Sequence, residues 1–117
     1  MTPSTNDRRI DYIEFPARDL MLTKAFYQSL FGWTFEDYGP EYTSFHDGRI
    51  AGGFYTSNDF VCGGALVVIF ADDLEAMKAK ALALGATLTK DIFEFPGGKR
   101  FQFLDPNGHE LSVWSNP

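Results

Sequence analysis

The chain has 117 residues, of which 44% are hydrophobic and 22% charged, the composition of one ordinary globular domain. Its 10 basic and 16 acidic residues give a net charge of −6 without a dense Lys/Arg cluster, which disfavours a nucleic-acid partner. One cysteine excludes an internal disulfide framework, and no apolar run approaches the roughly 20 residues of a membrane span. We therefore expect a cytoplasmic protein with no membrane or nucleic-acid partner and a polar tail over residues 1–9.

The first half of the sequence predicts a strand, a helix and three further strands. The first strand covers 10–15 and ends at Pro16, because proline cannot donate to a β-ladder. Asp19 is a suitable N-cap for a helix to about Phe31, and Gly32 is placed to end it. The apolar stripe expected on this helix comprises Leu22, Ala25, Phe26 and Leu30. The later strands are expected at 33–35, 42–45 and 49–51, the last two joined by a hairpin at Asp47-Gly48, with Phe54 and Tyr55 as an optional extension of the last strand.

The second half predicts the same order of elements after a linker at 57–64. The run 65–70 is almost entirely apolar, so we expect a strand covered on both faces. Asp72 or Asp73 caps a second helix, 74–84, whose predicted buried stripe is Leu74, Met77, Ala81 and Leu84. The remaining strands are expected at 86–88, 93–95, 99–104 and 110–114.

The two halves form an internal repeat. Asp19-Leu20 matches Asp73-Leu74, and Gly32-Trp-Thr-Phe35 matches Gly85-Ala-Thr-Leu88. Neither half can bury its own sheet well, so the pattern predicts one α+β domain over 10–117. Its modules would cover about 10–56 and 65–115.

These motifs resemble the vicinal oxygen chelate superfamily, which includes glyoxalase I, bleomycin-resistance proteins and extradiol dioxygenases. The resemblance rests on Asp19-Leu20, Phe26-Tyr27, 30–33 and, in the second half, 71–74 and the Asp-Pro-Asn-Gly turn at 105–108. It covers most of the chain and implies two tandem βαβββ modules that form one cup-shaped mixed sheet. It also implies a homodimer. The fold supports many chemistries and does not define an activity by itself.

In members of this superfamily that use a metal, the resemblance places the ligands on the first and last strands of each module. The matching positions here are Tyr12, Leu66, Ser112 and the stretch 51–53. Leucine cannot coordinate a metal, and the chain has only two histidines, His46 and His109, both beside turns. We therefore expect no metal site and no cofactor, which argues against glyoxalase and dioxygenase activity.

Strand parity defines the side chains expected to face the cup. Most are apolar or aromatic, as in small-molecule pockets, with polar groups at a few points. Arg100 is a candidate for binding an anionic group, and Trp114 for stacking on a planar one. The predicted ligand-binding residues are Tyr12, Leu66, Val68, Phe70, Arg100, Ser112 and Trp114.

Glu14 is the candidate catalytic residue, because a carboxylate on an apolar wall would have a raised pKa and could act as acid or base. An ion pair or a position at a dimer seam is the structural alternative. Cys62 has no neighbouring cation or helix N-terminus that would activate a thiol, and the two histidines are interpreted as turn residues.

The sequence thus favours a protein that binds a small organic molecule in an apolar cup without the usual metal. The alternative is an isomerase or lyase that uses Glu14, with Tyr12 or Arg100 orienting the substrate. A glyoxalase-like lyase would need a metal bound by non-standard ligands. A regulatory module is a further alternative, although no effector domain is attached.

Overall fold

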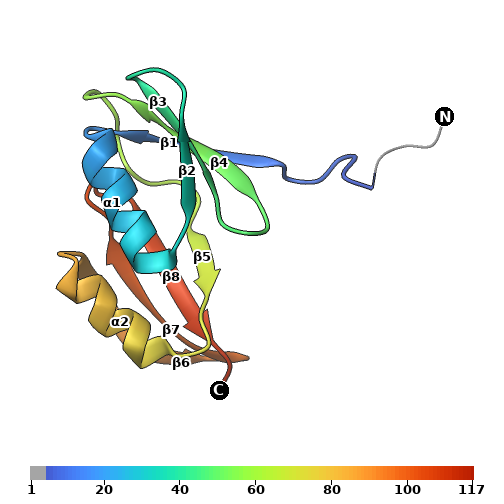
Figure 1. The fold of residues 1–117 in the computed structure, drawn as a ribbon. Coiled ribbons are helices and arrows are strands. Elements are labelled where there is room, and N and C mark those ends of the chain that lie inside the picture. Colours follow the sequence, from blue (N-terminus) through green and yellow to red (C-terminus); the bar gives the residue numbers. More distant parts are fainter. Residues whose placement is uncertain (1–4) are drawn as a thin grey trace.

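The computed structural model describes residues 5–117, which form two βαβββ modules in tandem (Figure 1). The polar tail expected at 1–9 lies outside the described residues over its first four positions. The elements are β1 (Tyr12–Ala17), α1 (Leu20–Phe31), β2 (Thr34–Asp37), β3 (Tyr42–His46), β4 (Ala51–Thr56), β5 (Val67–Phe70), α2 (Leu74–Ala83), β6 (Thr87–Phe95), β7 (Gly98–Leu104) and β8 (Glu110–Ser115).

Each module builds one four-stranded mixed sheet, in the orders β1-β4-β3-β2 and β5-β8-β7-β6. The first strand of each module pairs in parallel with the last, and the other neighbours are antiparallel. The expected α+β class with duplicated βαβββ modules is confirmed. Hydrogen bonding divides the strands of the described chain into two sheets, where the sequence predicted one.

Local capping signals fix both helices. The carboxylates of Asp19 and Asp73 accept hydrogen bonds from the third residue beyond each cap, and Gly32 ends α1 in the left-handed conformation at φ 73°. The predicted apolar stripe of α1 is partly wrong, since Leu22 is 56% exposed. Thr23 and Tyr27 are buried instead, because their hydroxyls find acceptors or donors inside the protein.

Two strand boundaries differ from the prediction. β1 continues through Pro16 to Ala17, since it is an edge strand that pairs only with β4 among the described residues. The Pro16 carbonyl accepts a hydrogen bond from the His109 ring at 2.7 Å. β6 is one strand, where two short ones were predicted, and two register shifts let it continue along β7.

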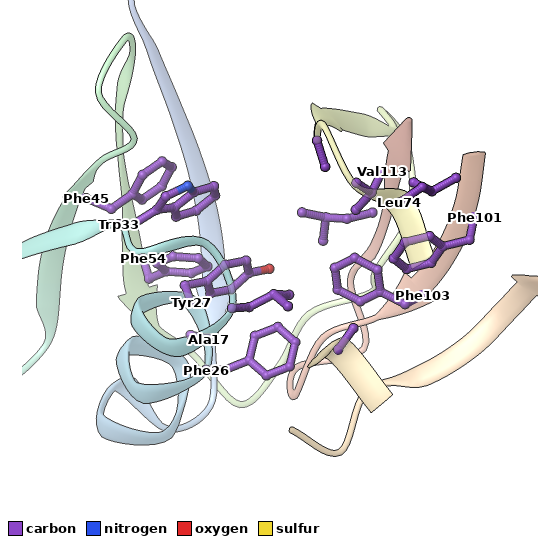
Figure 2. Packing of buried hydrophobic residues seen from close by; sticks show 14 residues of the cluster. Ala17, Phe26, Tyr27, Trp33, Phe45, Phe54, Leu74, Phe101, Phe103 and Val113 are labelled. Atoms are coloured by element: carbon purple, nitrogen blue, oxygen red, sulfur yellow. The ribbon is translucent and has the colours of Figure 1, made fainter. Parts of the chain in front are cut away.

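The core is aromatic and lies between the two modules (Figure 2). The Tyr27 ring stacks on Trp33 at 4.8 Å, and Trp33 stacks on Phe45 at 4.5 Å. Phe26 of α1 contacts Phe103 of β7 at 6.1 Å between ring centroids, so one cluster spans both modules. This shared burial explains why neither half needs a complete core of its own.

A buried polar joint accompanies this core. The Tyr27 hydroxyl donates to Asp105 Oδ2 at 2.7 Å, while the amide of Asn107 donates to Thr23 Oγ1 at 3.1 Å. The Arg18 backbone N–H donates to Asn107 Oδ1 at 2.9 Å. The turn between β7 and β8 therefore holds the start of α1 and binds one module to the other.

The sheet faces away from the helices remain open in the single chain. Leu66, just before β5, and Val68 and Phe70 within it are 38%, 44% and 46% exposed, so the prediction that both faces of this strand are covered is wrong. In Figure 1 both helices lie along one side of the molecule, and no helix covers the opposite faces. Neither helix of the described part is long and apolar enough to cross a membrane.

Candidate ligand-binding site

A hydrogen-bonded cluster lies on the open face of the first sheet. Tyr12 and Glu14 of β1 share this face with Tyr42 and Ser44 of β3, since Glu14 and Ser44 are both in register with Gly53. The Tyr42 hydroxyl donates to Glu14 Oε2 at 2.9 Å, and the Tyr12 and Tyr42 hydroxyls are hydrogen-bonded to each other. These groups form a chain of hydroxyls that ends on a carboxylate.

Gly53 makes room for this cluster. A Cβ atom at that position would lie 2.0 Å from the Tyr42 hydroxyl oxygen and 2.7 Å from that of Tyr12. Burial raises the pKa of Tyr42, and its hydrogen bonds with Tyr12 and Glu14 raise this pKa further. Tyr42 is therefore a neutral donor towards Glu14 at physiological pH.

Glu14 does not have the environment expected for a catalytic acid or base. Its side chain is exposed in the chain alone, whereas the prediction placed it on an apolar wall. The Tyr42 hydrogen bond orients the carboxylate but leaves it open to solvent. Glu14 therefore lies on the open face, but it lacks the burial that a proton-transfer role would require.

The open face of the second sheet gathers four of the predicted residues. Phe70 and Arg100 are both in register with Trp114, and the rings of Phe70 and Trp114 meet edge to face at 5.1 Å. A pocket of about 350 Å³ lies against Val68, Arg100, Trp114 and the 95–97 corner. Arg100 is the one charged residue among those that line this pocket in the described chain.

A second cavity, of about 430 Å³, lies at the seam between the modules. Its lining includes Glu14 from β1, Leu66 before β5, His109 before β8 and Glu110 at the start of β8. Leu66 at this seam and Val68 at the aromatic pocket are alternate residues of one strand run, so they point to the same face.

The polar groups of β8 are mostly engaged internally. Ser112 is in register with Val68 and so lies on the same side of the sheet, but it is fully buried and its hydroxyl donates to the Phe101 carbonyl at 3.2 Å. Glu110 accepts hydrogen bonds from Thr89 at 2.6 Å and Gln102 at 3.1 Å. The hydrogen bond from Thr89, and to a smaller extent that from Gln102, holds the pKa of Glu110 below its usual value.

The residues at the superfamily's metal positions do not fit a divalent ion. The Tyr12 hydroxyl is bonded to Tyr42, Leu66 has no donor atom, and the Ser112 hydroxyl is buried against a carbonyl. Within residues 5–117, no three His, Cys, Asp or Glu side chains come together in a way that could hold a metal. This donor set lacks the carboxylates and imidazoles that divalent ions require.

The histidines and the cysteine have structural surroundings. His109 is buried, stacks on Phe60 at 5.6 Å and bonds to the Pro16 carbonyl. His46 accepts from the Gly48 backbone N–H at 3.0 Å within its turn. Burial raises the pKa of the Cys62 thiol, which is the opposite of what a nucleophile needs.

The sequence reasoning missed several contributors to the open faces. Tyr42 and Ser44 alternate with the buried Thr43 and Phe45, and this period of two could have placed them on the same face as Glu14. Phe93 and Phe95 flank Arg100, but their position depends on the register shifts of β6, which leave no signal in the sequence.

Comparison with known proteins agrees with this architecture. The model of the Glyoxalase/Bleomycin resistance protein/Dioxygenase superfamily matches residues 9–113, so the chain belongs to this superfamily. No match is found among curated proteins.

Solved structures of the same fold include members with different activities. A glyoxalase/bleomycin resistance protein/dioxygenase family enzyme from Burkholderia phytofirmans is 21% identical, with a TM-score of 0.83 over 92% of this chain and 100% of that one. A mutant of the fosfomycin resistance protein FosX from Listeria monocytogenes, solved with Mn(II) and a dihydroxypropylphosphonic acid, is 16% identical, with a TM-score of 0.82 over 94% and 91%. A lactoylglutathione lyase from Agrobacterium tumefaciens is 21% identical, with a TM-score of 0.73 over 92% and 93%. At these identities the comparison supports the fold alone.

Proposed function

We propose that this protein binds a small organic molecule on the open faces of its sheets and does so without a divalent metal. The observation that carries the proposal is the run of exposed apolar side chains along β5, beside a pocket of about 350 Å³ with a single charged group. Concave apolar surface with few polar groups is typical of small-molecule sites. We further propose that the protein acts in the cytoplasm as a homodimer, in which a second copy would enclose these open faces.

Two experiments test this proposal. A ligand-observed NMR screen with neutral aromatic fragments should detect saturable binding to the wild type. Val68→Asn should weaken it, because that change places an amide on the pocket wall. Met21→Asn is the matched control, since Met21 is 79% exposed on α1, away from this face. Equal loss in both variants, or no fragment binding by the wild type, would contradict the proposal.

Metal content provides the second test. We expect purified, untagged protein to contain no stoichiometric metal, and its melting temperature to stay unchanged with Ni²⁺, Zn²⁺, Mn²⁺ or Fe²⁺. The reason is the donor set at the expected positions, which offers a phenol, an aliphatic side chain and a buried hydroxyl. A bound metal, or an increase in melting temperature that a chelator reverses, would instead favour a glyoxalase-like lyase.

An enzyme that uses Glu14 as acid or base is the second candidate function. The Tyr12–Tyr42–Glu14 hydrogen-bond chain favours it, because it connects a carboxylate to a phenol on the open face. For this role Glu14 would need to be enclosed by a partner or a ligand. In a Glu14→Gln variant, the binding function predicts fragment affinity close to that of the wild type. Once a ligand that turns over is known, the enzyme function predicts loss of turnover with binding retained.

A further inference from the structure

We propose that the aromatic pocket at Arg100 selects carboxylates attached to a planar apolar body, such as aryl carboxylates. This inference deepens the proposed function and depends on it. It starts from a cation without an acceptor. Arg100 forms no ion pair with any residue of the described chain, and its Nε atom is buried with no hydrogen-bond partner. A charged donor in this state is costly unless another molecule supplies the acceptor.

The surroundings hold this cation in place. The guanidinium carbon lies 5.1 Å from the Phe93 ring centroid and 5.4 Å from that of Phe95. Such cation–π contacts orient the guanidinium but satisfy none of its N–H groups. A planar fork of donors held by two rings matches the geometry of a carboxylate.

Nearby acids are directed elsewhere. Glu94 alternates with Phe93 and Phe95 along β6 and therefore points to the opposite face of the sheet. Asp91 forms an ion pair with Lys78 of α2 at 2.6 Å. No carboxylate of the described chain is therefore paired with Arg100.

The rest of the pocket defines the body of the ligand. Trp114 lies in register with Arg100, and Val68 and Phe95 complete apolar walls around about 350 Å³. An aromatic ring could stack on Trp114 while its carboxylate meets the guanidinium. A small polar anion such as acetate would satisfy the charge but leave these walls unfilled.

The test compares naphthoate, naphthamide and acetate by isothermal titration calorimetry. We expect wild-type protein to bind naphthoate at least about tenfold more tightly than naphthamide, the usual effect of a charge-assisted pair, and acetate most weakly. Arg100→Gln should abolish the preference for the carboxylate, and Arg100→Lys should reduce it. Lys99→Gln is the matched control, because Lys99 is adjacent in sequence but faces the other side of the sheet.

The possible outcomes separate this inference from the proposed function. Equal affinity for naphthoate and naphthamide would overturn the inference and leave the proposed function intact, and this comparison needs no variant to fold. Binding of neither compound would overturn both. If Arg100→Gln instead shifts the sedimentation coefficient of the free protein, the acceptor is a carboxylate of a second copy, and the inference is wrong.

Discussion

The hydrogen bond between Tyr27 and Asp105 provides the strongest test of how the two modules are held together. The Tyr27→Phe substitution keeps the ring, which is stacked on Trp33 at 4.8 Å, and removes only the hydroxyl. That hydroxyl is the partner of Asp105 Oδ2 at 2.7 Å, and Asp105 is 5% exposed. The other oxygen, Oδ1, keeps the backbone N–H donors of Asn107 and His109 at 2.9 and 2.8 Å.

The expected cost follows from this geometry. Losing a hydrogen bond to a buried charged group costs about 1.5–3 kcal/mol, and we expect a loss of about 2 kcal/mol in the free energy of unfolding at pH 7. For a domain of this size that corresponds to a decrease of about 8 °C in melting temperature. Urea unfolding followed by circular dichroism measures the free energy directly. Tyr55→Phe is the control, because Tyr55 is 40% exposed and the same change there should stay within about 0.5 kcal/mol.

The pH dependence gives an independent check. Burial, with Asp105 nearby, raises the pKa of Tyr27 well above its ordinary value. A phenol whose pKa is raised by folding contributes its full stabilisation of the folded state at pH values below its pKa in the unfolded chain, which is about 10. This stabilisation is lost as the pH rises further. Above pH 10 the wild type should therefore lose stability relative to Tyr27→Phe, and the difference between the two should shrink as the pH rises. A difference that is constant with pH, or no greater than that of Tyr55→Phe, would refute the reasoning.

Two further predictions concern residues within the sheets. Gly52→Ala should cost about 3 kcal/mol in urea unfolding, because its Cβ would lie 2.3 Å from the Ile13 carbonyl oxygen, which the backbone fixes in place. Gly53→Ala should cost only about 1 kcal/mol, because its Cβ meets the mobile end of Tyr42, and the pKa of Tyr42 should fall; equal costs would contradict this distinction. Thr89→Val should raise the pKa of Glu110 in an NMR titration, since Thr89 is the main cause of its lowered value. A carboxyl group whose pKa is lowered by folding stabilises the folded state at pH values above its pKa in the unfolded chain, and this stabilisation is lost in acid. The Thr89→Val variant should therefore be less stable than the wild type at pH 7 and equally stable at low pH.

Features that depend on local sequence were predictable. The two aspartate caps, the glycine that ends α1 and the Asp-Gly hairpin each act through neighbours a few residues away, and each appears as expected. Their repetition in the two halves also identified the duplicated module. The alternation of Ile13 and Phe15 with Tyr12 and Glu14 correctly separated the core side of β1 from its open side.

Features that depend on contacts between the modules were not predictable in the same way. The buried stripe of α1 rotates towards Thr23 and Tyr27 because Asn107 and Asp105, about 80 residues later, supply their polar partners. An apolar stripe alone favoured Leu22, which is exposed. The exposure of β5 has a similar origin, since an apolar run does not reveal whether its second face is covered by the same chain or by another molecule.

The register of β6 illustrates how two irregularities can create a site. Leu88 is opposite Phe103, and a regular antiparallel ladder counted on from that pair would bring Asp91 opposite Arg100. The two register shifts insert two residues on the β6 side, so Phe93 lies opposite Arg100 and Asp91 pairs with Lys78 instead. A regular strand would have given Arg100 an internal carboxylate, and the pocket would then contain a satisfied ion pair. Because the bulges place aromatic rings there, the positive charge is held in position without an acceptor, which is the arrangement that an anionic ligand requires.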